Sequence, residues 1–436
     1  MPGLLYKVLK WTEKYTKTDM VYLFEGGFWI TLGRVVATLS GFLLTLVLAN
    51  AISKESLGTY KFIQSIAGII TAFSLTGMGT AVTQAVSRGN EGALIDGFRT
   101  YLKWSIVMTI GAALCAVYYF IKDNTVLAWS LILVGITLPL IQSGGFYSPY
   151  LIGKQEFKAE TLYGIFYTIL PPLATGVAAL LTENPVVLIA AFFCTSALTT
   201  MILYVLVIKK FPPGKKERTA ETLSYGKHLS AMNILGTISF QLDKILLFHY
   251  LGAAQLALYS IATAPPQQIR YLNKVLGNLA LPKISAAQAT DVKRSLPRKA
   301  FLLFLAAVIL TILYVSAAPY VYSWFFPQYI DAIIYSQMFA LIILFFPSVL
   351  FQQALTAYMD QKSLYIIQTG GPILKVTLFV ILLPLFGIMG IIISALTTEV
   401  LRMGFVIYAF NKLPTASQPL SDKPDNFSDR DKNTLT

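Results

Sequence analysis

Residues 27–50 read GFWITLGRVVATLSGFLLTLVLAN, an apolar run in which Arg34 is the only charged residue. A transmembrane α-helix needs about 20 such residues to cross the hydrocarbon core of a bilayer. Runs of this kind follow one another along the 436-residue chain, and the dyad alternation of membrane-barrel strands is absent. The sequence therefore predicts an all-α polytopic membrane protein with twelve transmembrane helices, at 27–50, 58–84, 100–121, 126–152, 161–182, 185–208, 228–250, 253–280, 300–325, 330–356, 364–385 and 388–411.

The composition excludes several classes of protein. Hydrophobic residues make up 56% of the chain and charged residues 13%, with a mean hydropathy of +0.64, whereas a soluble domain is about one-quarter charged. Cys115 and Cys194 lie inside apolar runs, and His228 and His249 supply no ligand set for zinc. No P-loop sequence for ATP hydrolysis occurs. We expect a protein that is not an enzyme and that uses neither a metal nor a cofactor.

The basic residues predict the orientation. If the N-terminus is cytoplasmic, 27 of the 34 Lys and Arg residues fall in cytoplasmic segments, and only Lys54, Lys61 and Lys122 fall outside. Such an excess on one side is the positive-inside signal, and it is lost for an odd number of helices. We therefore expect both termini in the cytoplasm, and we attribute the net charge of +13 to membrane topology rather than to nucleic-acid binding.

The longest central loop separates six predicted helices from six. Leu57-Gly58-Thr59-Tyr60 recurs as Leu256-Ala257-Leu258-Tyr259, an offset of 199 residues, at the start of the second helix of each half. The halves are thus predicted to be parallel repeats, related by a pseudo-two-fold axis along the membrane normal. The expected organisation is an amphipathic cytoplasmic segment (1–26), an N-lobe (27–208), a cytoplasmic linker (209–227), a C-lobe (228–411) and a disordered cytoplasmic tail (412–436).

The first helix of each half carries a polar stripe. In the first half it is formed by Thr31, Arg34, Thr38, Gly41 and Thr45, which share an arc of about 80°. The offset of 199 gives Ser230, Asn233, Thr237, Phe240 and Lys244 in the seventh helix, with Gln241 beside them. A polar stripe in lipid must face protein or water. We interpret the two stripes as the walls of a hydrated cleft between the halves; close helix packing would explain the Thr and Gly residues, but not Arg34 and Lys244.

Charged residues inside the predicted helices suggest two roles. Arg34 and Lys244 suit an anion, because Arg offers a fork to phosphate oxygens and Lys a mobile charge, although both are also near enough to an interface to snorkel. Asp243 and Glu399 are the acidic residues deep in a helix. For Glu399 we expect an ion pair with Lys375 and with Arg402, while coupling to a proton or sodium ion is the alternative for either acid.

Three stretches resemble a known family. Residues 33–60 (GRVVATLSGFLLTLVLANAISKESLGTY), 239–262 (SFQLDKILLFHYLGAAQLALYSIA) and 384–396 (PLFGIMGIIISAL) are similar to prokaryotic oligosaccharide-lipid flippases of the multidrug/oligosaccharidyl-lipid/polysaccharide exporter superfamily. The resemblance covers about 25–411. One departure is Ala257, which stands where repeat symmetry with Gly58 would place a glycine.

The resemblance implies a two-lobed transporter in the cytoplasmic membrane that flips an undecaprenyl-diphosphate-linked oligosaccharide to the outer leaflet by alternating access. Arg34 and Lys244 would bind the diphosphate, and the cavity would be lined by Thr31, Thr38, Thr45, Asn233, Thr237 and Gln241. Its partners would be the lipid-linked oligosaccharide, membrane lipids, a coupling ion and polysaccharide-assembly proteins. The alternatives are a cation-coupled multidrug exporter, a peptidoglycan-precursor flippase, and a membrane polymerase or glycosyltransferase, which the short predicted outer loops disfavour.

Overall fold

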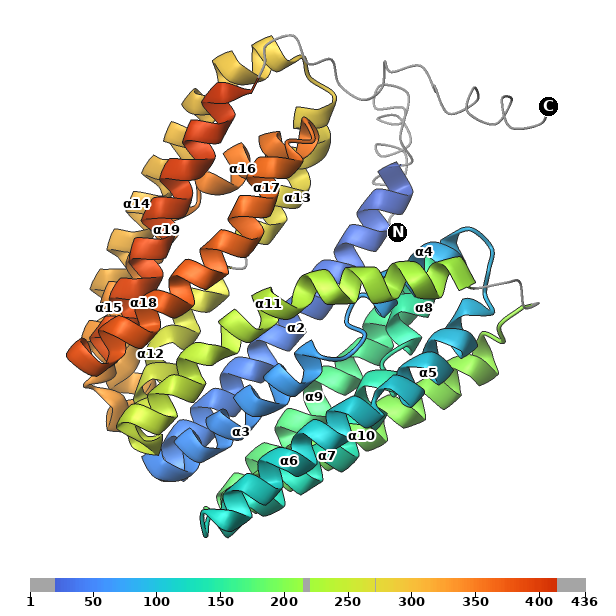
Figure 1. The fold of residues 1–436 in the computed structure, drawn as a ribbon, viewed down its shortest axis with the longest axis vertical. Coiled ribbons are helices and arrows are strands. Elements are labelled where there is room, and N and C mark those ends of the chain that lie inside the picture. The colour runs from blue at the N-terminus through green and yellow to red at the C-terminus, as the bar shows by residue number, and fades with distance from the viewer. Residues whose placement is uncertain (1–19, 215–219, 271, 414–436) are drawn as a thin grey trace, which may run out of the picture. The chain divides into compact units, whose positions relative to one another are not determined.

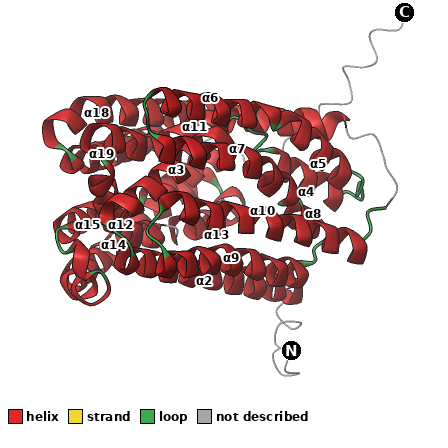
Figure 2. Ribbon diagram, turned by 90° about the horizontal axis from the view of Figure 1, so that it is seen from below, coloured by secondary structure: helices red, strands yellow, loops and turns green. Residues whose placement is uncertain are grey.

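A computed structural model describes residues 20–214, 220–270 and 272–413, and in this part of the chain every regular element is a helix (Figures 1 and 2). The first half contains α2 (Met20–Ala51), α3 (Lys54–Ala72), α4 (Met78–Ser87), α5 (Ala93–Trp104), α6 (Ile106–Ile121), α7 (Thr125–Gly144), α8 (Tyr147–Gly153), α9 (Phe157–Leu181) and α10 (Pro185–Lys210).

The second half repeats this order. It contains α11 (Ala220–Leu251), α12 (Ala253–Arg270), α13 (Leu272–Ser285), α14 (Ala289–Phe325), η1 (Pro327–Tyr329), α15 (Ala332–Ala340), η2 (Leu341–Phe345), α16 (Ser348–Ala357), α17 (Gln361–Tyr365), the π-helical η3 (Ile366–Gly370), α18 (Gly371–Phe386) and α19 (Ile388–Lys412). The chain forms two compact units, Met1–Gln241 and Leu242–Thr436, so that the boundary falls within α11.

The helices coincide with the predicted spans. Ten helical segments in the described residues are long and apolar enough to cross a membrane. The other two predicted spans, 58–84 and 253–280, are the second span of each half; the first of them is divided into α3 and α4, and the second comprises α12 and α13, which flank residue 271, outside the described residues. Phe73–Gly77 interrupts the first of them, while Pro265 and Pro266 lie in α12 of the second.

The two halves share several helix–helix contacts. In each, the second span contacts the fourth (α3 and α7; α12 and α15), the fourth contacts the sixth (α7 and α10; α16 and α19), and the fifth contacts the sixth (α9 and α10; α18 and α19). The repeated tetrapeptides are equivalent in burial as well, because Leu57 and Tyr60 are fully buried and so are Leu256 and Tyr259. The sequence repeat thus reflects a repeated packing arrangement.

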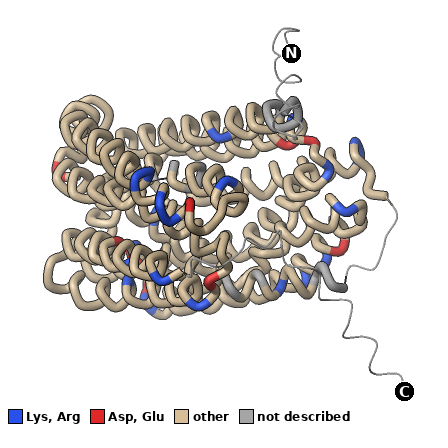
Figure 3. The backbone as a smooth tube through the Cα atoms, turned by 90° about the horizontal axis from the view of Figure 1, so that it is seen from above, with Lys and Arg blue, Asp and Glu red and all other residues tan. Residues whose placement is uncertain are grey.

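The outer surface is apolar over long stretches. Leu114, Leu180 and Ile309, from three different helices, expose 67%, 71% and 60% of their surface, and charged residues are sparse along the helices (Figure 3). Exposing such a surface to water is unfavourable, whereas exposing it to lipid acyl chains is not. The chain is a multi-pass membrane protein.

Some predicted boundaries shift. Of the predicted linker 209–227, residues 209–210 end α10 and 220–227 begin α11, because the helices continue beyond the apolar runs. Residues 20–26 of the predicted surface helix are continuous with α2. Residues 1–19 of that segment and 414–436 of the predicted tail lie outside the described residues.

Candidate functional site

α2 packs against α9 along a seam that recurs every seven residues, at Gly26, Gly33, Ser40 and Val47. Side chains of α9 lie 3.0 Å and 3.4 Å from the positions that a Cβ would take at Gly26 and Gly33. The Ser40 hydroxyl donates a hydrogen bond to the Thr168 carbonyl oxygen at 2.7 Å. The small residues therefore allow a close approach of the two backbones.

The predicted polar stripe lies on a different face of α2, about 120° around the helix from the seam. Thr31, Arg34 and Thr38 are exposed, and no hydrogen bond or ion pair joins the Arg34 guanidinium to another described residue. The third face carries exposed apolar side chains: Val35, Leu39 and Leu43. Arg34 thus stands on a polar surface that is distinct from both the packing seam and the face suited to lipid.

Thr45 ends the stripe. Its hydroxyl is half-buried and donates to the Gly41 carbonyl oxygen at 2.8 Å within the same helix. A hydroxyl bonded in this way is tolerated in an apolar environment, because its donor is satisfied locally. The stripe therefore has its exposed, strongly polar part at Thr31–Thr38.

A neutral polar pocket of about 230 Å³ lies between α3, α7, α9 and α10. Gln64, Gln142 and Tyr167 are half-buried in its wall, and Ser196 lies deeper, with 1% of its surface exposed. The Gln64 amide donates to the Tyr60 hydroxyl at 2.9 Å, while the Ser196 hydroxyl oxygen has no hydrogen-bond partner in the described structure. None of the residues that line the pocket is charged. Its chemistry suits an uncharged ligand that offers hydroxyl groups.

The first part of α11 packs on the same unit as this pocket. Gln241 lies against Gly68 of the pocket wall, where an added Cβ would come within 2.6 Å of the Gln241 amide nitrogen. Ser230 is buried, and its hydroxyl accepts a hydrogen bond from the Gly77 N–H at 2.9 Å. Asn233 is exposed and Thr237 half-buried, with its hydroxyl bonded to the Asn233 carbonyl oxygen at 2.9 Å. The stripe on α11 is thus partly used for packing.

Asp243 lies in the second unit and is 4% exposed. Its carboxylate accepts hydrogen bonds from the Tyr259 hydroxyl at 2.7 Å and from the Lys244 N–H at 2.8 Å. Tyr259 belongs to the repeated tetrapeptide, and its buried phenol is the partner of this acid. The Lys244 side chain is half-buried. Arg34 and Lys244 belong to different compact units.

Glu399 and Arg402 form an ion pair within α19, with the guanidinium Nε 2.8 Å and Nη2 2.5 Å from the same carboxylate oxygen. Arg402 also donates to Gln352 Oε1 at 3.3 Å and to Ser348 Oγ at 3.4 Å. The network joins α19 to α16, and its hydrogen bonds compensate in part for placing charges among apolar helices. The Lys375 ammonium lies 5.0 Å from the ring centroid of Phe379, one turn further along α18.

Sequence reasoning missed most of the neutral pocket. Gln64, Tyr167 and Ser196 are single polar residues in apolar runs. They come together only because α3, α9 and α10 meet in the fold. A helical-periodicity search finds residues on one helix and cannot find a set contributed one by one from several helices.

Comparisons with known proteins agree with this architecture. Residues 23–288 match the family model described as "Polysaccharide biosynthesis protein". The fold is similar to an inward-facing multidrug resistance MATE family transporter of the MOP superfamily, with 13% identity, a TM-score of 0.67, and coverage of 88% of this chain and 96% of that chain. It is also similar to the lipid II flippase MurJ in an inward closed conformation, with 12% identity, a TM-score of 0.68, and coverage of 88% and 87%. A comparison with curated protein sequences gives no match.

At these identities the likeness shows the fold. It confirms the predicted all-α polytopic architecture of twelve transmembrane helices in two halves of six. The fold is that of a transporter.

Proposed function

Because the chain belongs to the polysaccharide biosynthesis protein family, we propose that it flips an undecaprenyl-diphosphate-linked oligosaccharide from the inner to the outer leaflet of a prokaryotic cytoplasmic membrane. The proposed mechanism is alternating access between an N-lobe (27–208) and a C-lobe (228–411), without a chemical reaction. Both termini are placed in the cytoplasm. The repeated order of helices and the basic residues of the cytoplasmic segments support this arrangement.

The main observation that supports this proposal is Arg34, which is exposed on the polar face of α2. A charged head group loses its hydration when it enters hydrocarbon, which is costly. A guanidinium that faces neither the packing seam nor the apolar face of its helix is placed to replace part of that hydration, since it offers paired donors to phosphate oxygens. Thr31, Thr38 and Thr45 extend the polar surface along α2, and Lys244 would supply a second charge from α11.

The neutral pocket supports a sugar-bearing substrate. Amide and hydroxyl groups in its wall match sugar hydroxyls, and the buried Ser196 hydroxyl still has hydrogen-bonding capacity. Gln241 lies beside the pocket at Gly68, and Asn233 and Thr237 would continue the polar lining along α11. A cation-coupled exporter of cationic drugs would need acidic residues here, and the lining residues carry no charge.

The acidic residues of the second unit would serve different purposes. Glu399 is held by Arg402, so we assign this pair a structural role, and we assign Lys375, which lies over the Phe379 ring, the same kind of role. Asp243 accepts hydrogen bonds only from neutral donors among the contacts described above, so it is the proposed site of coupling to a proton or sodium ion.

The test is export of polysaccharide by cells whose own gene is replaced by a variant. Arg34→Ala should abolish surface polysaccharide and cause the lipid-linked oligosaccharide to accumulate, whereas Arg34→Lys should retain part of the activity because the charge remains. Lys122→Ala, which removes an exposed charge at a predicted outer loop, should export normally. Normal export by Arg34→Ala at equal protein abundance would refute the assignment, and efflux of cationic dyes would favour the drug exporter.

A further inference from the structure

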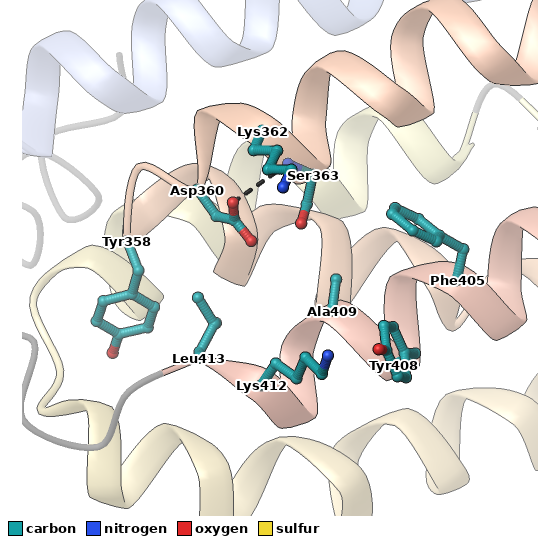
Figure 4. A pocket seen from close by; sticks show the side chains of 9 residues that line it. All are labelled: Tyr358, Asp360, Lys362, Ser363, Phe405, Tyr408, Ala409, Lys412 and Leu413. Atoms are coloured by element: carbon teal, nitrogen blue, oxygen red, sulfur yellow. Dashed lines mark hydrogen bonds between the residues drawn. The ribbon is translucent and has the colours of Figure 1, made fainter.

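A groove of about 380 Å³ lies at one end of the second unit, between the α16–α17 connection and the end of α19 (Figure 4). Lys362 and Ser363 border it from the start of α17, while Phe405, Tyr408 and Lys412 border it from α19. The two lysines and Tyr408 are exposed, and Phe405 is half-buried. We call this the lysine groove. It combines two ammonium groups, three hydroxyls and one carboxylate with an apolar wall.

The lysine groove lies where two membrane spans end. Gln361 begins one candidate span and Lys412 ends the next. Residues at such positions meet the boundary between hydrocarbon and water, whichever side of the membrane they face. A ligand in the groove therefore has its polar part at the membrane surface and an apolar wall leading toward the acyl chains.

The carboxylate in the groove does not cancel its positive charge. Asp360 is used as a helix cap, since its side-chain oxygen accepts a hydrogen bond from the Ser363 N–H at 3.2 Å. Its single negative charge lies in a wall that also holds two lysines. At the beginning of α14, Lys293 reaches the end of α19, and Asp291 lies near Tyr358 of the groove. The local balance of charge is positive.

The end of a helix would normally repel an anion, because its last carbonyl oxygens carry partial negative charge. Here the Lys293 ammonium donates hydrogen bonds to the carbonyl oxygens of Asn411 and Leu413. This contact neutralises the end of α19 beside the groove. The Lys412 ammonium, 4.6 Å from the Tyr408 ring centroid, remains at the rim.

We propose that the lysine groove binds the phosphate headgroup of an anionic phospholipid in the inner leaflet. Basic pockets between transmembrane helices are the kind of site that recognises such headgroups. The apolar wall favours a lipid over free phosphate, which has no part to place against Phe405. The choice of the inner leaflet rests on the orientation proposed above, whereas binding itself does not depend on which substrate is transported.

The experiment measures lipid retained by the purified full-length protein, by native mass spectrometry after exchange into micelles containing phosphatidylglycerol or phosphatidylcholine. The wild type should retain phosphatidylglycerol selectively. Each of Lys362→Gln and Lys412→Gln should weaken retention about fivefold, and the double variant more. The control is Lys209→Gln with Lys210→Gln, which removes two exposed charges at the end of α10 and should leave retention unchanged.

Equal retention of the two lipids, unchanged retention by the Lys362/Lys412 double variant, or an equal loss in the control would overturn the proposal. Release of phosphatidylglycerol by millimolar inorganic phosphate would show a site for free phosphate and would also overturn it. Thermal unfolding of the double variant should match the wild type, which confirms that a loss of lipid is not a loss of fold. Arg34→Ala should still retain phosphatidylglycerol, so this proposal and the transport proposal fail separately.

Discussion

Glu91 ties three segments of the first unit together. One carboxylate oxygen lies 2.8 Å from the Lys154 ammonium, and the other accepts the Gly214 N–H at 2.8 Å and the Tyr150 hydroxyl at 3.3 Å. The hydrogen bond from Lys154 lowers the pKa of Glu91, and the Gly214 N–H adds to this effect, while partial burial opposes it. The loop before α5 thereby holds the chain that follows α10.

The lowered pKa predicts an acid-dependent contribution to stability. A carboxyl group whose pKa is lower in the folded state stabilises the fold above its unfolded pKa of about 4.3, and this contribution is lost as the pH falls through the folded pKa. We expect Glu91→Gln to reduce the free energy of unfolding at pH 7 by about 0.5 kcal/mol, since the pair is partly exposed.

The measurement is thermal unfolding in detergent at pH 7 and pH 3. The difference between Glu91→Gln and wild type should shrink at pH 3. Glu156→Gln, at an exposed carboxylate two residues after Lys154, should change neither value. A destabilisation by Glu91→Gln that is as large at pH 3 as at pH 7 would contradict the linkage.

Single residues also show what sequence reasoning can reach. Arg34 was identifiable because its polar neighbours repeat at helical spacing, and the structure places that stripe on a face of its own. Arg402 was correctly expected as a partner of Glu399, since residues three apart face each other on a helix. Its contacts with Gln352 and Ser348 were not predictable, because they depend on how α16 approaches α19.

At the scale of elements, glycines shape the turn between α18 and α19. Gly387 has a φ of 59°, a conformation that side chains with a Cβ rarely adopt, and a Cβ at Gly390 would overlap the Leu382 carbonyl oxygen. Both glycines belong to PLFGIMGIIISAL, one of the stretches that resemble the flippase family. The resemblance there reflects a tight turn between two spans.

Substitutions in this turn should destabilise the protein. We expect Gly387→Ala to cost about 1–2 kcal/mol through the left-handed backbone, and Gly390→Ala to cost more because backbone atoms must move. Gly371→Ala, in the same span but with open space around it, should be neutral or stabilising by about 0.5–1 kcal/mol.

These values are obtained from denaturant unfolding in detergent micelles. If Gly371→Ala lowered stability as much as Gly390→Ala, a general sensitivity of this span to substitution would explain the data, and the argument from the turn would be wrong.

The divided second span of the first half shows the limit of hydropathy at this scale. The apolar run 58–84 predicts one helix, but Phe73–Gly77 separates α3 from α4, and the Gly77 N–H bonds to Ser230 of α11. Apolar length indicates that a segment crosses the membrane. The break depends on a hydrogen bond to a residue 153 positions away, which no local pattern contains.

At the scale of the whole molecule, the number of spans, their order and the repeat were predictable from the sequence. The number and order of the spans follow from apolar length and from basic residues on one side, which a bilayer imposes on every segment. The repeat was visible in a tetrapeptide that recurs at an offset of 199 residues. The neutral pocket was not predictable from the sequence, because its residues come from four different helices. The predicted cleft between the lobes remains a proposal.

The proposed orientation predicts which loops a membrane-impermeant thiol reagent can reach. In a variant with Cys115 and Cys194 replaced by Ala, Lys122→Cys should be labelled in intact cells. Pro212→Cys, after α10, should be labelled only once the membrane is opened. Both positions are exposed, so access to the reagent depends on the side of the membrane. Labelling of Pro212→Cys in intact cells would reverse the orientation.

The seven-residue recurrence of Gly26, Gly33, Ser40 and Val47 has a mechanical consequence. Two turns of a straight α-helix take about 7.2 residues. Contacts that repeat every seven residues stay aligned only if the two helices wind about each other with a left-handed sense. The helices of the first and fifth spans, α2 and α9, are therefore expected to form a left-handed coiled pair. If the proposed alternating access tilts α2, α9 must move with it, and the two helices would then move as one unit.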